Sequence, residues 1–387
     1  MTSSSTGMYY KGKSSFSVYE EMEKQLQDAG WSSMPLSRIA ICDIILGDRF
    51  KIPYVQLRCE PMAPSSRLGG VRWINYFKGS NYLTMKAHMA QVLKTMDSTS
   101  SEWMPETYVL GGDQKIKADE REGMMAAATA AENATWIIKP GSGAKGKGIL
   151  IVRGSQPIRE LIESHPEHSK LTYAVQRYVD RPLLLTHGRK FDIRVWTLLT
   201  SPYSIYAFSQ ASCRTASAPY DPDQIDDTLA HLTNHCLQEG AADFGRYEDG
   251  NELWLPELQA YLEGRGEPAS VLRADIVGQM ANIVVRTLLA MRPEMEVGPE
   301  EAFQCFQLFG YDMLVDESYR VHLLEINGSP GVAERWLSTV VRQARQLLGC
   351  GDGGAPVATR WDIDKAELVR LWQVGDPVPA GMHASIV

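Results

Sequence analysis

The chain has 387 residues, of which 44% are hydrophobic and 22% are charged, and it carries a net charge of −8. This length predicts two or three lobes around a shared cleft rather than one domain. The negative charge argues against bulk binding to nucleic acid, and no apolar run approaches the roughly 20 residues of a membrane-spanning helix. Six cysteines are scattered along the chain, and its first residues lack the apolar stretch of a signal peptide, so we expect a cytoplasmic protein with free thiols.

The first part of the chain predicts a small α/β lobe over residues 1–84. Apolar residues at helical spacing predict a helix over residues 16–29. Apolar runs predict strands over residues 39–46 and 71–77, and a second helix is expected over residues 86–96.

Basic residues are concentrated in this first part. Between Arg49 and Lys94 there are eight basic residues and one acid. On an otherwise acidic protein, such a stretch favours a docking surface for an acidic partner. An ordinary solvated face is the alternative interpretation.

A glycine-rich loop lies in the second lobe, which we place at residues 85–179. Residues 141–148 contain four glycines and two lysines between apolar runs at 136–139 and 149–152. The glycine run of a dinucleotide-binding fold or a P-loop has to open a helix, whereas this one leads into a strand. We therefore predict a β-hairpin flap that covers phosphates, with Lys139 within reach of them. A surface hairpin without a ligand is the alternative.

The strand predicted over residues 190–196 alternates strictly between polar and apolar residues. Because side chains alternate between the two sides of a strand, Lys190, Asp192 and Arg194 share one face. A row of charged side chains backed by an apolar core is costly to bury without a ligand or partners. The row therefore favours a binding site, with a solvated sheet face as the alternative.

Two further strands, over residues 306–315 and 321–327, are separated by a short polar turn and predict a β-hairpin. If the hairpin is symmetric about its turn, Asp312 lies opposite Glu325, and Asn327 points the same way. Carboxylates directly opposite each other are destabilising unless a cation lies between them. Such a cluster of hard oxygen ligands suits Mg²⁺, with a simply exposed acid as the alternative.

Taken together, these segments resemble the motifs of the tubulin–tyrosine ligase family, in the family's order. The resemblance runs from about residue 16 to residue 340 and includes the first lobe. The lobe and the short length after Pro330 resemble the family members that add tyrosine more than the larger glutamylases and glycylases. The motifs are Trp136-Ile137-Ile138-Lys139 with Gly143-Ala144-Lys145-Gly146, Arg189-Lys190-Phe191-Asp192-Ile193-Arg194, Cys213-Arg214-Thr215-Ala216-Ser217, His231-Leu232-Thr233-Asn234-His235-Cys236, Phe306-Gln307-Leu308-Phe309-Gly310-Tyr311-Asp312 and Leu324-Glu325-Ile326-Asn327-Gly328-Ser329-Pro330.

The resemblance implies an α+β protein with the ATP-grasp fold. An N-terminal tubulin-docking lobe (1–84), a central lobe (85–179) and a C-terminal lobe (180–387) would surround a nucleotide cleft. The implied enzyme is a monomeric ligase near the cytoskeleton that uses ATP and Mg²⁺ to join free tyrosine to detyrosinated α-tubulin through an acyl phosphate. Addition of glutamate or glycine, or a catalytically idle tubulin-binding module, are the alternatives.

The same resemblance implies a role for each motif residue. Arg194, Arg214 and Glu325 are expected to be catalytic. Asp312, Glu325 and Asn327 are expected to hold Mg²⁺. The residues expected to bind the nucleotide are Lys86, Lys139, Gly143, Lys145, Gly146, Gln176, Arg177, Tyr178, Val179, Lys190, Asp192, Thr233 and Asn234.

The predicted contacts to tubulin are Arg49, Lys51 and Lys78. Lys51 and Lys78 stand where the family often has arginine. Because lysine lacks the two-pronged guanidinium of arginine, this departure implies a weaker or differently arranged grip on tubulin.

Overall fold

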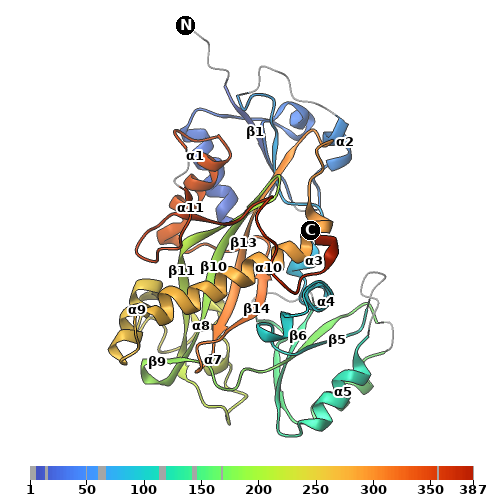
Figure 1. The fold of residues 1–387 in the computed structure, drawn as a ribbon, viewed down its shortest axis with the longest axis vertical. Coiled ribbons are helices and arrows are strands. Elements are labelled where there is room, and N and C mark those ends of the chain that lie inside the picture. The colour runs from blue at the N-terminus through green and yellow to red at the C-terminus, as the bar shows by residue number, and fades with distance from the viewer. Residues whose placement is uncertain are drawn as a thin grey trace.

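The computed structural model describes residues 6–13, 16–48, 50–59, 67–112, 119–141, 146–166, 169–354 and 357–386. These residues form a mixed α/β structure with one large sheet and one small sheet, as Figure 1 shows. The mixture of helices and strands was predicted from the sequence. The two sheets lie beside each other and meet at the pocket described below.

The large sheet has twelve strands within the described residues. Its centre is formed by three long antiparallel strands, β10 (Arg189–Thr200), β11 (Ser204–Pro219) and β13 (Gln304–Val315). The other strands are β1 (Met8–Lys11), β2 (Ser32–Ser33), β3 (Ile44–Leu46), β4 (Trp73–Asn75), β9 (Leu184–Leu185), β12 (Glu252–Trp254), β14 (Val321–Asn327), β15 (Val357–Ala358) and β16 (Leu368–Trp372).

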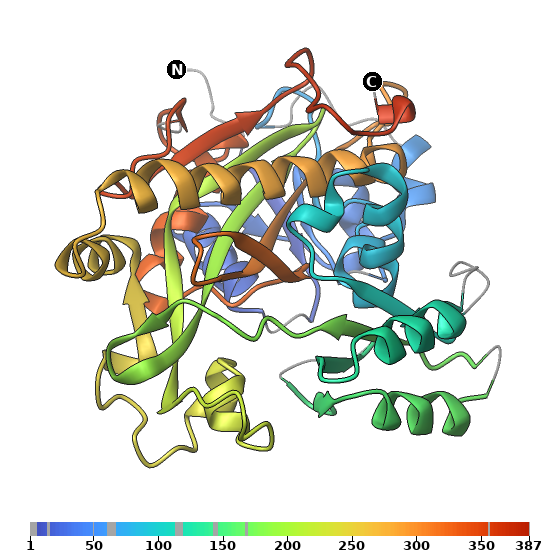
Figure 2. The same ribbon diagram turned by 60° about the horizontal axis from the view of Figure 1, so that its bottom comes forward.

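The long helix α10 (Val277–Met295) crosses the face of the large sheet that is turned away from Asp312 (Figures 1 and 2). Its Thr287 hydroxyl lies 2.9 Å from the hydroxyl of Tyr311, whose side chain alternates with that of Asp312 along β13. Residues 271–295 are long and apolar enough to cross a membrane, contrary to the expectation from the apolar runs. However, 67% of the apolar window is buried inside the fold, as expected of a core helix.

Helix α11 (Glu334–Leu347) packs beside α1 (Ser17–Asp28). Trp336 on α11 contacts Phe208 of β11, with ring centroids 5.9 Å apart, and Phe208 in turn contacts Trp196 of β10. Trp196 shares the face of Arg194, since the two are two residues apart on one strand. Other helices beside the large sheet are α2 (Tyr54–Cys59), α3 (Asn81–Thr84), α7 (Thr228–His231), α8 (His235–Gln238) and α9 (Leu255–Gly264).

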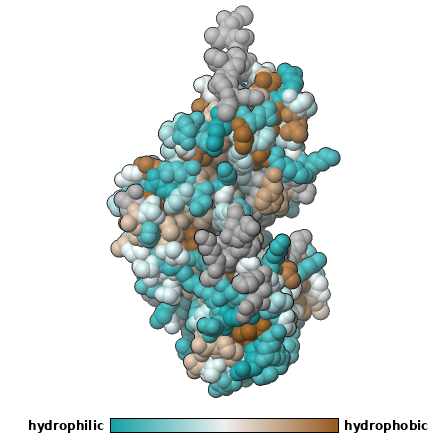
Figure 3. Space-filling view, turned by 90° about the vertical axis from the view of Figure 1, so that its right-hand side faces the viewer, coloured by the Kyte–Doolittle hydropathy of each residue, from teal (hydrophilic) through white to brown (hydrophobic). Residues whose placement is uncertain are grey.

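The small sheet has the strand order β5 (Thr107–Leu110), β8 (Tyr173–Arg177), β6 (Thr135–Pro140) and β7 (Leu150–Arg153). Helices α5 (Arg121–Ala130) and α6 (Gln156–Ser164) cover it, and a separate core with Trp136 and Val175 fills the space between. Strands β6 and β7 pair antiparallel, so the glycine-rich segment joins two strands of a hairpin as predicted. Helix α4 (Lys86–Met96) packs against this sheet and against α10, with the bounds expected from the sequence. On the side that carries α4 and α5, hydrophilic side chains predominate and apolar ones form small separate groups (Figure 3).

Strand β4 pairs in parallel with β13, so a strand of the first lobe and a strand of the last part belong to one sheet. The proposed division at residues 84 and 179 stays a prediction. The expected strand over residues 39–46 is wrong in its first half, because residues 36–41 form a 3₁₀ helix before β3.

The basic stretch is dispersed by the fold. Arg72 is fully buried and donates hydrogen bonds to backbone carbonyl groups. Lys86 lies in the pocket, and Lys94 forms an ion pair with Glu120 at 2.6 Å. Arg49 lies outside the described residues. A continuous basic docking surface made of the whole stretch is therefore wrong for the residues that the structure describes.

The chain after residue 348, whose structure the sequence left open, continues the fold. Strand β16 pairs with β11. The backbone N–H of His383 donates to the carbonyl oxygen of Met96 at 2.8 Å, and the side chain of Ile386 is 2% exposed. The last residues thus fix the C-terminal end of α4, the helix that begins with Lys86.

Candidate active site

A pocket lies where the hairpin β6–β7 of the small sheet faces strands β10, β13 and β14 of the large one. Lys139 and Ile137 reach it from the same side of β6, while Trp136 and Ile138 point into the core of the small sheet. Because of this alternation, one side of β6 contributes to the core of the small sheet and the other side lines the pocket.

A β-bulge at Leu324 sets the geometry of the hairpin β13–β14. Near the turn, Val315 pairs with Val321 and Met313 with Leu323, whereas Asp312 pairs with Glu325. Without the extra residue, the same turn would place Asp312 opposite Leu324 and turn Glu325 to the other face. The bulge therefore brings the two carboxylates together. The pairing was predicted correctly, although the assumption of an undisturbed symmetric hairpin was wrong.

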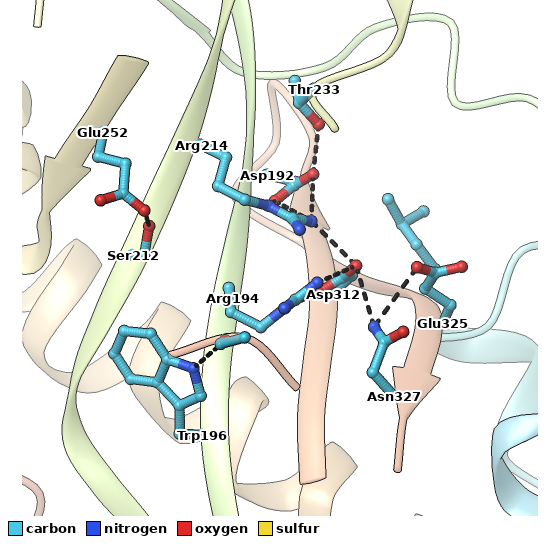
Figure 4. Close-up of polar contacts among 12 residues, drawn as sticks. Asp192, Arg194, Trp196, Ser212, Arg214, Thr233, Glu252, Asp312, Glu325 and Asn327 are labelled. Atoms are coloured by element: carbon cyan, nitrogen blue, oxygen red, sulfur yellow. Dashed lines mark hydrogen bonds and ion pairs between the residues drawn. The ribbon is translucent and has the colours of Figure 1, made fainter. Parts of the chain in front are cut away.

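Asp312 lies at the centre of a buried set of ion pairs (Figure 4). Arg194 donates two hydrogen bonds to its carboxylate, one of them 2.9 Å long, and Arg214 lies 2.9 Å from the same group. Arg214 also donates to Asp192 at 2.7 and 2.8 Å, and the Thr233 hydroxyl donates to Asp192. Burial by itself would raise the pKa of Asp312, but the charges of Arg194 and Arg214 outweigh it and hold the pKa well below its usual range.

The cluster Asp312, Glu325 and Asn327 fits a hard cation. The amide nitrogen of Asn327 lies 3.4 Å from an oxygen of each carboxylate, so a hydrogen-bond donor takes the place between them (Figure 4). Turning this amide over would present its oxygen instead, which would complete a set of oxygen ligands of the kind that Mg²⁺ prefers. Lys86 pairs with Glu325 at 2.9 Å, so α4 supplies a further positive charge at this end.

Lys139 is held at the same end of the pocket. Its ammonium group donates to the Gln176 side chain at 2.7 Å and lies 3.4 Å from the carbonyl oxygen of Leu324, the bulge residue. Burial lowers the pKa of Lys139 to about 8, partly opposed by the charge of Glu325. A buried ammonium with so few partners is well suited to an anionic ligand.

A series of hydrogen bonds holds Lys190 in the same pocket. His231 Nε2 lies 3.2 Å from the carbonyl oxygens of Asp221 and Gln224, so it must donate, and its Nδ1 must accept. The Tyr178 hydroxyl lies 2.8 Å from Nδ1 and donates to it, and Lys190 donates to the Tyr178 oxygen at 2.7 Å. Burial and the Lys190 charge lower the pKa of His231, which favours the neutral ring that this series of hydrogen bonds requires.

The structure brings together most of the residues that the sequence singled out. Gly143 and Lys145 lie outside the described residues, and Lys51 and Lys78 are exposed on the surface, away from the pocket lining. Arg194 and Asn327 reach Asp312 from the edge of the pocket. The pocket is lined by Lys86, Lys139, Gly146, Gln176, Arg177, Tyr178, Val179, Lys190, Asp192, Arg214, Thr233, Asn234, Asp312 and Glu325.

Sequence reasoning assigned neither the apolar lining nor His231 to the site. The apolar residues are Ile137, Ile149, Leu232, Leu314 and Leu324. Alternation along β6 and β13 could have identified two of them, because Ile137 precedes Lys139 by two residues and Leu314 follows Asp312 by two. Leu232 and Leu324 stand within the quoted motifs but were given no role there, and Ile149 was placed only in the apolar run after the glycine-rich loop.

Comparison with known proteins supports a single family. The model of the tubulin-tyrosine ligase family matches residues 65–348. A probable alpha-tubulin polyglutamylase, Ttll1 of Tetrahymena thermophila, is 29% identical over 298 residues, which cover 69% of this chain and 68% of that protein. A probable tubulin polyglutamylase of Caenorhabditis elegans, ttll-9, is 30% identical over 251 residues, 64% of this chain and 57% of that protein. The human tubulin polyglutamylase TTLL6 is 28% identical over 277 residues, 66% of this chain and 28% of that protein.

The chain therefore spans between about a quarter and about two thirds of the length of these relatives. All three are named as polyglutamylases, so free tyrosine as the added amino acid, which the sequence led us to expect, gains no support from them. The family match covers most of the described pocket, including both carboxylates of the bulged hairpin. On these grounds the chain belongs to the tubulin-tyrosine ligase family of ATP-dependent ligases.

Proposed function

We propose that this protein is an ATP- and Mg²⁺-dependent ligase that joins glutamate to a carboxyl group of the acidic tail of tubulin. The observation that carries the proposal is the convergence of Lys86, Lys139, Asp312 and Glu325 in one pocket between two sheets. Three kinds of chemical group that phosphoryl transfer needs meet there: ammonium groups, oxygen ligands for a hard cation, and a pair of buried guanidinium groups.

The pocket has two chemically different ends, which fit the two ends of ATP. At one end, Ile137, Ile149 and Leu232 form a small apolar cluster with Tyr178, which suits an adenine ring. At the other end, the ammonium groups and the Asp312–Glu325 pair suit a triphosphate with its cation. Lys190 lies beside Tyr178, so we place its ammonium at the base end rather than among the phosphates. Two sheets that close on a nucleotide are the arrangement expected of an ATP-grasp fold.

The residues present can carry out a two-step ligation. In the first step, the acceptor carboxylate oxygen attacks the γ-phosphorus of ATP, ADP leaves, and an acyl phosphate forms. In the second step, the amine of the incoming amino acid attacks the acyl carbon, phosphate leaves, and the amine loses a proton. Arg194 and Arg214 would neutralise the acyl phosphate and the oxyanion that develops beside it, and Lys139 would hold the transferred phosphoryl group. When bound at Asp312, Glu325 and Asn327, Mg²⁺ supplies charge neutralisation on the phosphates.

The choice of glutamate rests on the names of the relatives, which support addition of glutamate rather than tyrosine. Tyrosine is the second candidate, because the resemblance noted in the sequence includes the first lobe, as in the members that add tyrosine. An idle tubulin-binding module is disfavoured, because a protein that only binds tubulin has no need for Lys139, Asp312, Glu325 and Asn327 in one pocket.

Exposed Lys51 and Lys78 are the described candidates for a contact with tubulin outside the pocket. The proposed setting is the cytoplasm near microtubules, with the protein acting as a monomer. Charge reversal at Lys78 should weaken association with tubulin, and more so at low ionic strength, because salt screens exposed charges.

The deciding experiment is a panel of labelled amino acids. The protein is incubated with ATP, Mg²⁺ and either tyrosinated or detyrosinated tubulin, together with labelled glutamate, glycine or tyrosine. Incorporation of glutamate alone supports the proposal, and incorporation of tyrosine only into detyrosinated α-tubulin would replace it with the second candidate. Absence of incorporation in every arm, with Glu325→Gln indistinguishable from the wild type in ATP binding, would refute the ligase.

A further inference from the structure

The row of paired residues that contains Glu325, Asp312 and Arg194 continues beyond the pocket onto β11 and β12. Glu325 pairs with Asp312, Asp312 with Arg194, Arg194 with Ser212, and Ser212 with Trp254. Directly paired residues on neighbouring strands point to the same side of a sheet. Trp254 therefore stands on the face of Arg194, two strands further out. Figure 4 shows Glu325, Asp312, Arg194 and Ser212 from this row.

An arginine from α11 covers this outer end of the row. The guanidinium carbon of Arg335 lies 5.3 Å from the ring centroid of Trp254 and 5.0 Å from that of Trp336. The two indoles meet edge to face with centroids 6.1 Å apart. Arg335 is exposed, and within the described residues no carboxylate forms an ion pair with it. A positive charge in contact with two aromatic rings is thus left available to a ligand.

The position of Arg335 relative to Arg194 is fixed by packing. Trp196, which shares a face with Arg194, donates its indole N–H to the carbonyl oxygen of Gly331 at 3.1 Å (Figure 4). Gly331 lies a few residues before α11, and Trp336 packs on Phe208 of β11. The stacked guanidinium therefore needs little ordering when a carboxylate binds to its free N–H edge.

The spacing indicates what kind of ligand could use both arginines. Arg194 on β10 and Trp254 on β12 are two strands apart, which separates their backbone positions by about 10 Å. An extended peptide covers about 10 Å in three residues. The side chain of a single free amino acid is too short to reach from the acyl carbon beside Arg194 to Arg335.

We propose that Arg335, held by Trp254 and Trp336, is a carboxylate-binding subsite for an acidic acceptor peptide, and that it binds an acidic side chain about three residues from the carboxyl group that is modified. The inference rests on the proposed function, because it assumes that the modified carboxyl group lies at Arg194. It assigns Arg335 a role in acceptor recognition and none in the chemical step.

The test uses a synthetic peptide with glutamate at the modified position and three residues to either side, and with neutral residues elsewhere. Peptide binding to the full chain in the presence of ATP analogue and Mg²⁺ is followed by tryptophan fluorescence, and turnover by labelled glutamate. Arg335→Ala should raise the Kd and the KM for the peptide about tenfold and leave kcat and the KM values for ATP and free glutamate unchanged. Arg335→Lys, which keeps the charge but loses the planar stacking, should lie between. Arg342→Ala removes another exposed arginine from the same helix and should behave as the wild type.

A second comparison separates recognition from a general effect of charge. Replacing one flanking glutamate of the peptide by glutamine should raise the Kd for the wild-type protein. For the flanking glutamate that Arg335 binds, the same replacement should leave the Kd of Arg335→Ala unchanged. Equal losses for both proteins with every peptide, or an unchanged Kd for Arg335→Ala, would overturn the inference. A raised KM for free glutamate alone would assign the subsite to the incoming amino acid and overturn it as well. Because binding is measured apart from turnover, a wild type that binds the peptide but ligates nothing would refute the proposed function and leave this comparison decisive.

Discussion

Substitution of the two paired carboxylates should separate catalysis from stability. Asp312 is 2% exposed and holds two arginines whose side chains are 12% and 11% exposed, whereas the side chain of Glu325 is 24% exposed and pairs with the Lys86 ammonium at 2.9 Å. We expect Asp312→Asn and Glu325→Gln both to abolish ligation, because each removes a charged ligand from the proposed cation site. Only Asp312→Asn should destabilise the fold strongly, because it leaves Arg194 and Arg214 short of their buried counter-charge.

The magnitude follows from the burial. Removing one partner from a buried ion pair costs about 3–5 kcal/mol, whereas an exposed pair contributes about 1 kcal/mol or less. An unfolding entropy of about 2.1 cal/mol/K per residue gives about 0.8 kcal/mol/K for a chain of this length. Asp312→Asn should therefore lower the Tm by about 4–6 °C, and Glu325→Gln by about 1 °C.

Thermal unfolding without nucleotide measures these shifts, and incorporation of labelled glutamate measures activity. Addition of ATP with Mg²⁺ should raise the Tm of the wild type, since a ligand that binds only the folded state stabilises it, and should raise that of Glu325→Gln less. If Asp312→Asn melts within about 1 °C of the wild type, the arginine–carboxylate set is not desolvated as the structure indicates. Full turnover in Glu325→Gln would remove the cation site.

Three further outcomes concern the base end of the pocket and the start of β10. His231→Phe should raise the KM for ATP several-fold with little change in kcat, because Tyr178 loses its hydrogen-bond acceptor and Lys190 loses its orientation. His231→Gln can both accept and donate, so it should keep most of the affinity for ATP. Equal KM values for both variants would contradict the proposed series of hydrogen bonds. Burial lowers the pKa of Lys190 to about 7, so between pH 7 and 10 the unfolded chain binds a proton at Lys190 that the folded protein has released. The urea midpoint of the wild type should therefore rise with pH in this window, and more steeply than that of Lys190→Met. Identical pH slopes for the two proteins would show that Lys190 keeps its proton. Arg189 is 1% exposed and bonds Glu248 with two N–H groups, one at 2.7 Å, so Arg189→Met should cost about 3 kcal/mol in urea unfolding, and adding Glu248→Gln should recover part of that loss; strictly additive losses would mean that the pair does not interact.

Local sequence pattern was sufficient for the elements whose side chains repeat regularly. Helix α4 begins at Lys86 and ends at Met96, as the apolar spacing predicted. The hairpin of β6 and β7 could be predicted because a glycine-rich segment lies between two apolar runs. Alternation along β10 correctly put Lys190, Asp192 and Arg194 on one face, since successive side chains alternate along a strand that has no extra residue.

Long-range structure could not be predicted in the same way. The parallel pairing of β4 with β13 joins residues more than two hundred positions apart, and no periodicity within either strand specifies the partner. The burial of Arg72, which removes it from the basic stretch, depends on backbone carbonyl groups that the fold brings around it. Charge counted along a sequence therefore says little about charge on a surface.

The chain's residues alone determined which chemistry was available: lysines beside a glycine hairpin, arginines on a central strand and two carboxylates near a turn. Only the tertiary structure decided how these groups meet, because the bulge at Leu324 sets which face Glu325 occupies, and packing of α11 sets where Arg335 lies. A single inserted residue reverses the side of every following side chain, and its location depends on the energy of the whole sheet rather than on any local preference.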